Sequence, residues 1–153
     1  MNANELVVHV DAKIINRHSK TEPKLTLVGY VTQDGEKEYD KIDVEDAIQT
    51  DAAELYAIRF AIEKLKNRPE KIVLLCDHES VVSVLRKDIQ NVKFRKKTRQ
   101  IMRDVWNALQ EYDHFEVRQF PLNQADKFLN EVWQKMKEKQ SPRSATGSAS
   151  KEL

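Results

Sequence analysis

Lys71-Ile-Val-Leu-Leu-Cys-Asp77 is the segment of this chain that constrains its fold most strongly. The apolar run from 72 to 76 is typical of a strand that is covered on both faces, as strands are in parallel sheets. The segment before it, from Asp51 to about Asn67, repeats apolar residues at spacings of three and four, which predicts a helix. Because a strand reached through a helix suggests a parallel crossover connection, we expect an α/β domain.

The other elements extend this pattern in both directions. The turn signal Asp34-Gly35 predicts a hairpin, and the polar segment 13–24 is expected to be a long loop or the extended end of another hairpin. The fold class expected is α/β, with a five-stranded mixed sheet flanked by helices. Apolar patterns predict further strands near 5–12, 25–32, 37–43 and 115–120, and further helices near 78–87, 98–112 and 123–137.

The length of 153 residues fits one domain with a single core. We expect that domain to occupy residues 1–138 and residues 139–153 to form a disordered tail, since the chain from Gln140 is rich in Ser and Ala without periodicity. No apolar run approaches the roughly 18 residues that span a bilayer, and the N-terminus does not resemble a signal peptide. We therefore expect a cytoplasmic monomer without a membrane partner. A lone cysteine, Cys76, excludes an intramolecular disulfide framework.

The net charge of +1 hides a strong asymmetry along the chain. Residues 34–54 contain nine acidic residues against two lysines, whereas residues 86–103 contain eight basic residues against one aspartate. The first region suits metal ions and the second suits polyanions. The second could also be an ordinary solvated helix face and loop. The residues expected to contact nucleic-acid phosphates are Lys93, Arg95, Lys96, Lys97 and Arg99.

Four acidic residues stand where the sheet is expected to meet its helices: Asp11, Glu54, Asp77 and Asp126. Each Mg²⁺ prefers hard oxygen ligands, and two ions about 3.5 to 4 Å apart can clamp both the attacking and the leaving oxygen of a phosphodiester. Three of the four have a simpler interpretation as helix caps or first-turn acids. Asp11, which we expect to end a strand without a helix after it, gains nothing from capping. Because carboxylates gathered at one sheet edge repel each other unless cations neutralise them, we favour a metal site.

In the order of its elements and in these acids, the chain resembles a type-1 ribonuclease H over residues 5–138. The matching stretches are VVHVDA with Asp11, DAAELYAIRFAIEKL with Glu54, IVLLCD with Asp77 and NQADKFLNEVW with Asp126. The resemblance implies a ribonuclease H-like fold in which these four residues are catalytic and bind two Mg²⁺ (or Mn²⁺) ions. Asp11 would bridge the two ions, Asp126 would hold one of them, and Glu54 and Asp77 the other. The implied reaction is cleavage of the RNA strand of RNA/DNA hybrids to leave a 5′ phosphate, with double-stranded RNA left open as a second substrate.

The chain departs from the pattern of that family at three places. Alanine follows Asp11 where glycine is usual, the segment 118–123 lacks a histidine, and Gln49-Thr50-Asp51 replace residues that usually contact ribose hydroxyls. These differences predict slow turnover and altered substrate contacts. They also keep open the alternative of a non-catalytic ribonuclease H-like module that binds nucleic acid. A proofreading exonuclease is disfavoured because the first strand lacks the Asp-x-Glu of that class, and an integrase or junction resolvase because the last acidic segment fits it less well.

Overall fold

The computed structural model describes residues 5–42, 50–86, 96–121 and 124–140 of the chain. The strands in these ranges are β1 (Glu5–Ile15), β2 (Leu25–Thr32), β3 (Lys37–Ile42), β4 (Lys71–Cys76) and β5 (Phe115–Gln119). The helices are α1 (Thr50–Leu65), α2 (Glu79–Arg86), α3 (Lys96–Glu111) and α4 (Gln124–Gln140). Their order along the chain is the order that the sequence patterns predicted.

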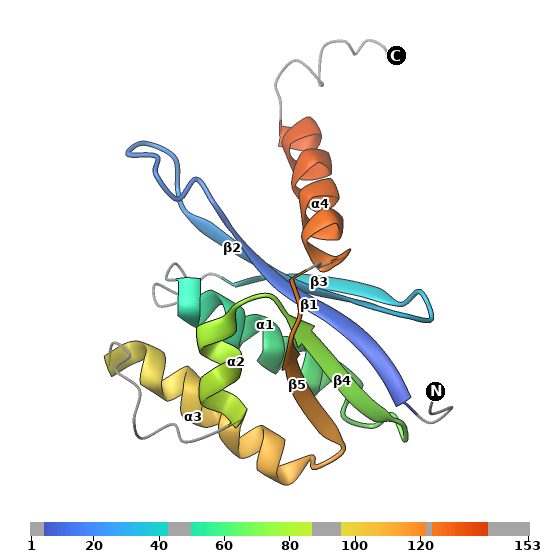
Figure 1. Cartoon of the computed structure of the whole chain (residues 1–153). Coiled ribbons are helices and arrows are strands. Elements are labelled where there is room, and N and C mark those ends of the chain that lie inside the picture. The colour runs from blue at the N-terminus through green and yellow to red at the C-terminus, as the bar shows by residue number, and fades with distance from the viewer. Residues whose placement is uncertain (1–4, 43–49, 87–95, 122–123, 141–153) are drawn as a thin grey trace.

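The strands form one mixed sheet in the order β3-β2-β1-β4-β5 (Figure 1). β1, β2 and β3 pair antiparallel, whereas β1, β4 and β5 pair parallel. The parallel pair β1–β4 requires a crossover between the two strands, and α1 lies in that crossover. The expected α/β fold with a five-stranded mixed sheet is therefore confirmed.

Helices cover both faces of this sheet (Figure 1). α1 packs on β1 and β2, with α2 and α3 on the same side, and α4 packs against the opposite face of β1 and β2. The sheet is thus the middle layer of three.

None of the helices in the part of the chain that the structure describes combines the length and the apolar character that crossing a membrane requires.

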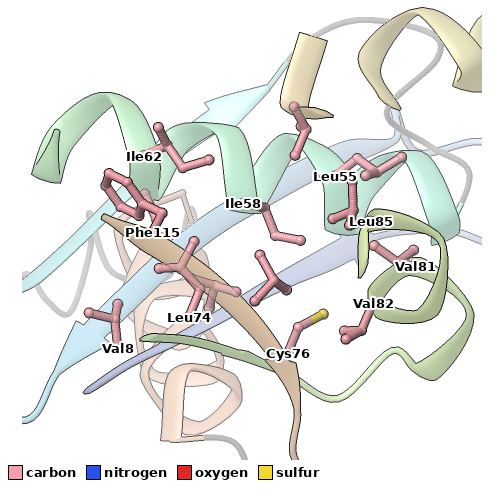
Figure 2. Packing of buried hydrophobic residues seen from close by; sticks show 14 of the residues in the cluster. Val8, Leu55, Ile58, Ile62, Leu74, Cys76, Val81, Val82, Leu85 and Phe115 are labelled. Atoms are coloured by element: carbon pink, nitrogen blue, oxygen red, sulfur yellow. The ribbon is translucent and has the colours of Figure 1, made fainter. Parts of the chain in front are cut away.

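The alternation of side chains along β1 explains the two cores of the domain. Val8 and Val10 point toward α1 and belong to the larger hydrophobic cluster. Figure 2 shows this cluster, in which Val8 and Leu74 of the sheet lie beneath Ile58 of α1. Ile15 belongs to a smaller cluster on the other face, together with Leu27, Leu129 and Val132. This second cluster attaches α4 to the sheet.

β1 is longer than the sequence indicated, and this corrects the expected place of Asp11. The strand was expected to end near residue 12, but it continues to Ile15 because β2 pairs with it along that whole length, from Val8↔Thr32 to Ile15↔Leu25. The pairing with β4 stops earlier, at His9↔Leu75. Asp11 therefore lies inside β1, just beyond the point where the parallel partner ends. The segment 13–24 is accordingly the extended end of a hairpin.

The C-terminal helix also runs past its expected end. α4 continues through Gln140, two residues beyond the expected domain boundary at residue 138. The expectation of a disordered tail concerns residues that otherwise lie outside the described part of the chain.

Gly29 allows α4 to approach the sheet beside Asp11. It is the residue that pairs with Asp11 across the β1–β2 ladder. A Cβ atom at this position would lie 2.8 Å from Cδ2 of Leu129 and 2.9 Å from the carbonyl oxygen of Glu38. Such a contact is shorter than packed atoms tolerate, so only glycine lets the helix sit this close.

We predict that Gly29→Ala lowers the free energy of unfolding by about 1 to 3 kcal/mol, because the added methyl group overpacks the interface between α4 and the sheet. Urea denaturation of the two proteins measures this difference. In a Leu129→Ala background the loss should be smaller, since one of the two obstructing atoms is gone. An equal stability of Gly29→Ala and the original protein would contradict this account of the close approach.

Candidate active site

The parallel pairing of β1 with β4 brings two of the four acids to the same level of the sheet. The register ends at His9↔Leu75, and continuing it by two residues places Asp11 opposite Asp77. Asp77 directly follows β4 and is exposed, whereas Asp11 is only 5% exposed. The neighbourhood that the sequence predicted for these two residues is thus present, although one of them is buried and the other faces solvent.

Glu54 is the second buried acid, at 6% exposure, and it reaches Asp11 from α1. The two carboxyl groups share a hydrogen bond. Burial, followed by this bond to Asp11, raises the pKa of Glu54 from 4.5 to about 10. Burial also raises the pKa of Asp11 to about 6, although the bond from Glu54 opposes that rise. Glu54 therefore keeps its proton at neutral pH, and its O–H donates a hydrogen bond to the carboxylate of Asp11.

One oxygen of Glu54 has no hydrogen-bond partner. Its Oε2 atom is buried and unpaired among the described residues. A buried carboxyl oxygen without a partner costs about 1 to 3 kcal/mol, so such an atom is rarely left without a reason. The carboxylate of Asp77 lies nearby, since ligand atoms of Glu54, Cys76 and Asp77 all lie within 4.8 Å of one another. The residue with the unpaired oxygen thus belongs to a group of side chains that could hold a cation.

The donor set fits a hard divalent cation better than a soft one. Oxygen atoms from Asp11, Glu54 and Asp77 gather here, and Mg²⁺ and Mn²⁺ take oxygen ligands. Cys76 is a poor ligand, because burial raises the pKa of its thiol far above the usual range and keeps it protonated. Figure 2 shows its side chain among apolar residues of the core, beside Val82. Cys76 is therefore a core residue that lies next to the acids.

Asp126 stands at the outer side of this group. It lies in the first turn of α4 and is exposed. Its charge, like that of Asp77, raises the pKa of Asp11, so it lies within electrostatic reach of the buried pair. The structure thus brings all four predicted acids to one edge of the sheet, but unequally. Asp11 and Glu54 are in direct contact, Asp77 is close to Glu54, and Asp126 acts on Asp11 through its charge.

Sequence reasoning assigned no role to two histidines that border these acids. Nε2 of His78 lies 2.7 Å from Oδ1 of Asp51, and the two side chains form an ion pair when the imidazole is protonated. This contact links the residue after Asp77 to the first turn of α1. His9 accepts a hydrogen bond at Nδ1 from the backbone N–H of Gln124, the first residue of α4. The available signal was position alone, since each histidine lies within two residues of an acid in the sequence.

The predicted nucleic-acid contacts fall largely outside the described side chains. Lys93 and Arg95 lie in the undescribed range 87–95, and Lys96 and Lys97 are the first two residues of α3. Arg99 is exposed on the first turns of the same helix. A role in binding nucleic acid stays a prediction for these five residues.

Comparisons with known proteins bear on the arrangement of these elements. No protein-family model matches the sequence, and no curated protein matches it either. Several solved structures, in contrast, are similar to this chain. Ribonuclease H1 from the halophilic archaeon Halobacterium salinarum NRC-1 is 18% identical with a TM-score of 0.56, and the match covers 81% of this chain and 89% of that one. The chain has a ribonuclease H-like fold.

Two further structures with the ribonuclease H-like fold agree with this assignment. LC11 ribonuclease H1, isolated from compost by a metagenomic approach, is 16% identical with a TM-score of 0.61, and the match covers 84% of this chain and 92% of that one. The foamy viral protease-reverse transcriptase in complex with an RNA/DNA hybrid is 16% identical with a TM-score of 0.60. That match covers 82% of this chain but only 18% of the viral protein, so the chain corresponds to a small part of it. Identities this low establish the fold alone.

The buried acids make a prediction for the metal-free protein. The raised pKa values of Asp11 and Glu54 mean that the folded state binds protons more tightly than the unfolded state does. The stability that these two groups contribute is therefore complete at low pH, and it is lost as the pH rises above their ordinary pKa values and through the folded-state values of about 6 and about 10. In EDTA at pH 8, Glu54→Gln should raise Tm by about 3 °C or more, because a neutral amide replaces an acid that is costly to ionise.

The same variant should lose the stabilisation by divalent ions. Mg²⁺ or Mn²⁺ is expected to raise the Tm of the original protein, because a ligand that binds only the folded state stabilises it. Thermal denaturation in EDTA and in each ion measures both effects. Glu63→Gln, an exposed change on the same helix, is the matched control. A Glu54→Gln protein that melts lower than the original in EDTA, or that keeps the full response to ions, would contradict our view of this pair.

Proposed function

We propose that this chain is a metal-dependent endonuclease that hydrolyses the RNA strand of RNA/DNA hybrids. The observation that carries the proposal is the buried carboxyl pair of Asp11 and Glu54, in which Glu54 has an unpaired oxygen and lies close to Asp77. A pair like this weakens the fold unless something else stabilises it. Strongly perturbed acids at the edge of a sheet are typical of functional sites, and a ribonuclease H-like fold provides the setting in which they serve a nuclease.

The acids have a common role in this proposal. Asp11, Glu54, Asp77 and Asp126 would hold two Mg²⁺ or Mn²⁺ ions, and Glu54 would give up its proton on binding them. Ions held in this way activate a water molecule for attack on the scissile phosphate and stabilise the leaving 3′ oxygen, so that the product keeps a 5′ phosphate. The exposure of Asp77 and Asp126 leaves that side of the group open to a phosphate backbone.

The substrate is chosen from the similar structures and from the charge pattern. One of the similar structures contains an RNA/DNA hybrid, and another foamy viral protease-reverse transcriptase structure contains double-stranded DNA. Both support a duplex nucleic acid as the partner of this chain. The run of basic residues from Lys93 to Arg99 supports a polyanion such as nucleic acid as the binding partner. We place the RNA/DNA hybrid first and keep double-stranded RNA as a second substrate to be tested.

We predict that the protein makes internal cuts in the RNA strand of a labelled hybrid in Mg²⁺ or Mn²⁺ and makes none in EDTA. Asp77→Asn should reduce the rate by at least about 100-fold, because an amide is a weaker ligand than a carboxylate and leaves the local charge unbalanced. Gel analysis of the cleaved strand measures the rate, and the susceptibility of the product to a 5′-phosphate-dependent exonuclease identifies its end.

Asp113→Asn is the matched control, since it is an exposed change in the turn before β5, at the opposite edge of the sheet. It should cut like the original protein. Parallel reactions with double-stranded RNA and DNA define the substrate. The nuclease proposal would be wrong if the folded protein bound the hybrid without cutting it in either ion, and if Asp77→Asn bound it equally well. The chain would then be a non-catalytic module that binds nucleic acid.

We also predict that binding to the hybrid depends on salt. If the basic residues contact about four phosphates, the logarithm of the affinity should fall against the logarithm of the salt concentration with a slope of about 3 to 4. Replacing Lys93, Arg95, Lys96, Lys97 and Arg99 by glutamine should flatten that slope. Fluorescence anisotropy with the cleavage-deficient Asp77→Asn protein measures it. An affinity that does not change with salt concentration would show that these five residues do not contact the phosphates of the hybrid.

A further inference from the structure

His9 contacts both sides of the connection between β5 and α4. It lies on β1 two residues before Asp11, on the same face of the strand, and it is half-buried. Before the connection, the ring of Phe120 packs edge-on against the imidazole with 6.0 Å between ring centres. After the connection, the backbone N–H of Gln124 donates to Nδ1 of His9 over 3.3 Å. A single side chain on the central strand therefore touches both ends of this link.

Each of these contacts reaches a fixed part of the fold. Phe120 is itself tied to β4, because its backbone N–H donates to the carbonyl oxygen of Cys76 over 2.9 Å. Gln124 is the first residue of α4, and the first N–H groups of a helix have no acceptor within the helix. Nδ1 of His9 supplies an acceptor from outside. The side chain thus acts as a helix cap that is contributed by a distant strand.

The position of this cap matters for one acid in particular. Asp126 lies two residues after Gln124, in the same first turn of α4. The hydrophobic contacts of the helix through Leu129 and Val132 lie further along it, in the smaller core cluster. They hold the body of α4 against the sheet, whereas its first turn is held by the complete burial of Ala125 and by the bond from Gln124 to His9 on β1. That bond therefore contributes to the position of Asp126 relative to Asp11.

We propose that His9 is a positioning residue for the metal centre: its bond to the start of α4 places Asp126 opposite Asp11. The proposal rests on the proposed function, since it concerns the same four acids. His9 acts through Asp126 and needs no contact with a metal ion or with substrate. Its acceptor atom carries the effect, and the packing of its ring against Phe120 orients that atom.

Two substitutions separate the acceptor from the ring. His9→Asn keeps an acceptor at the same place, because Oδ1 of asparagine is as many bonds from Cα as Nδ1 of histidine is, but it loses the ring. His9→Phe keeps a ring against Phe120 and loses the acceptor. The matched control is His18→Phe, an exposed histidine in the turn between β1 and β2. Thermal denaturation in EDTA establishes that each variant is folded before its metal binding is compared.

The expected result is a selective loss of metal affinity. Calorimetric titration with Mn²⁺ should give an affinity about tenfold weaker for His9→Phe, which is the usual effect of removing a partner that orients a metal ligand. His9→Asn should bind within about threefold of the original protein, and His18→Phe should bind unchanged. Amide hydrogen exchange at Gln124 should accelerate in His9→Phe and stay slow in His9→Asn, because only the first variant loses the acceptor.

A further comparison tests whether His9 works through Asp126. In an Asp126→Asn background, His9→Phe should no longer weaken Mn²⁺ binding, since the ligand that it positions is already removed. An equal loss in both backgrounds would overturn the proposal, as would an unchanged affinity in His9→Phe while the original protein binds Mn²⁺ and cuts the hybrid. In that case the metal centre and the proposed function remain. An original protein that binds no Mn²⁺ would overturn the proposed function and the positioning role together.

Discussion

The pairing of β1 with β4 is the constraint on which the rest of this molecule depends. Two parallel strands cannot be joined by a tight turn, so the chain between β3 and β4 must cross the sheet, and α1 lies in that crossing. The same pairing brings the ends of both strands to one edge, where Asp11 and Asp77 come level. Because α1 packs on β1 and β2, it also brings Glu54 to that edge. One ladder of hydrogen bonds thus determines both the layers of the fold and the place of the acids.

The group of acids works against the stability that this arrangement provides. Asp11 and Glu54 are buried and share one proton, and the nearby charge of Asp77 makes ionisation of both harder. An apolar pair of similar size would be expected to stabilise the domain more than these carboxyl groups do. The unpaired Oε2 atom of Glu54 adds to that burden. Positions with a local cost of this kind are where a protein is expected to have a function, and here they lie together at one sheet edge.

Much of this organisation could be predicted because it depends on local patterns. The apolar run of residues 72–76 indicated a buried strand, and the spacing of Leu55, Ile58 and Ile62 indicated a helix with a buried face; both are present in the structure. The end of β1 was missed because residues 13–15 are held by pairing with β2, and that pairing is not visible in their own pattern. Asn16 then begins the turn with a φ of 59°, a conformation that asparagine tolerates better than most residues do.

The sequence by itself determined which residues could take part in chemistry, since four acids at the ends of elements are present whatever the fold does with them. It also determined the order of the strands and helices, because that order follows from apolar periodicity. Only the tertiary structure decided that Asp11 and Glu54 share a proton while Asp77 and Asp126 face solvent. It likewise decided that His9 reaches the start of α4, 115 residues away along the chain. Burial and contact between distant segments depend on how helices pack against strands, and no local pattern records them.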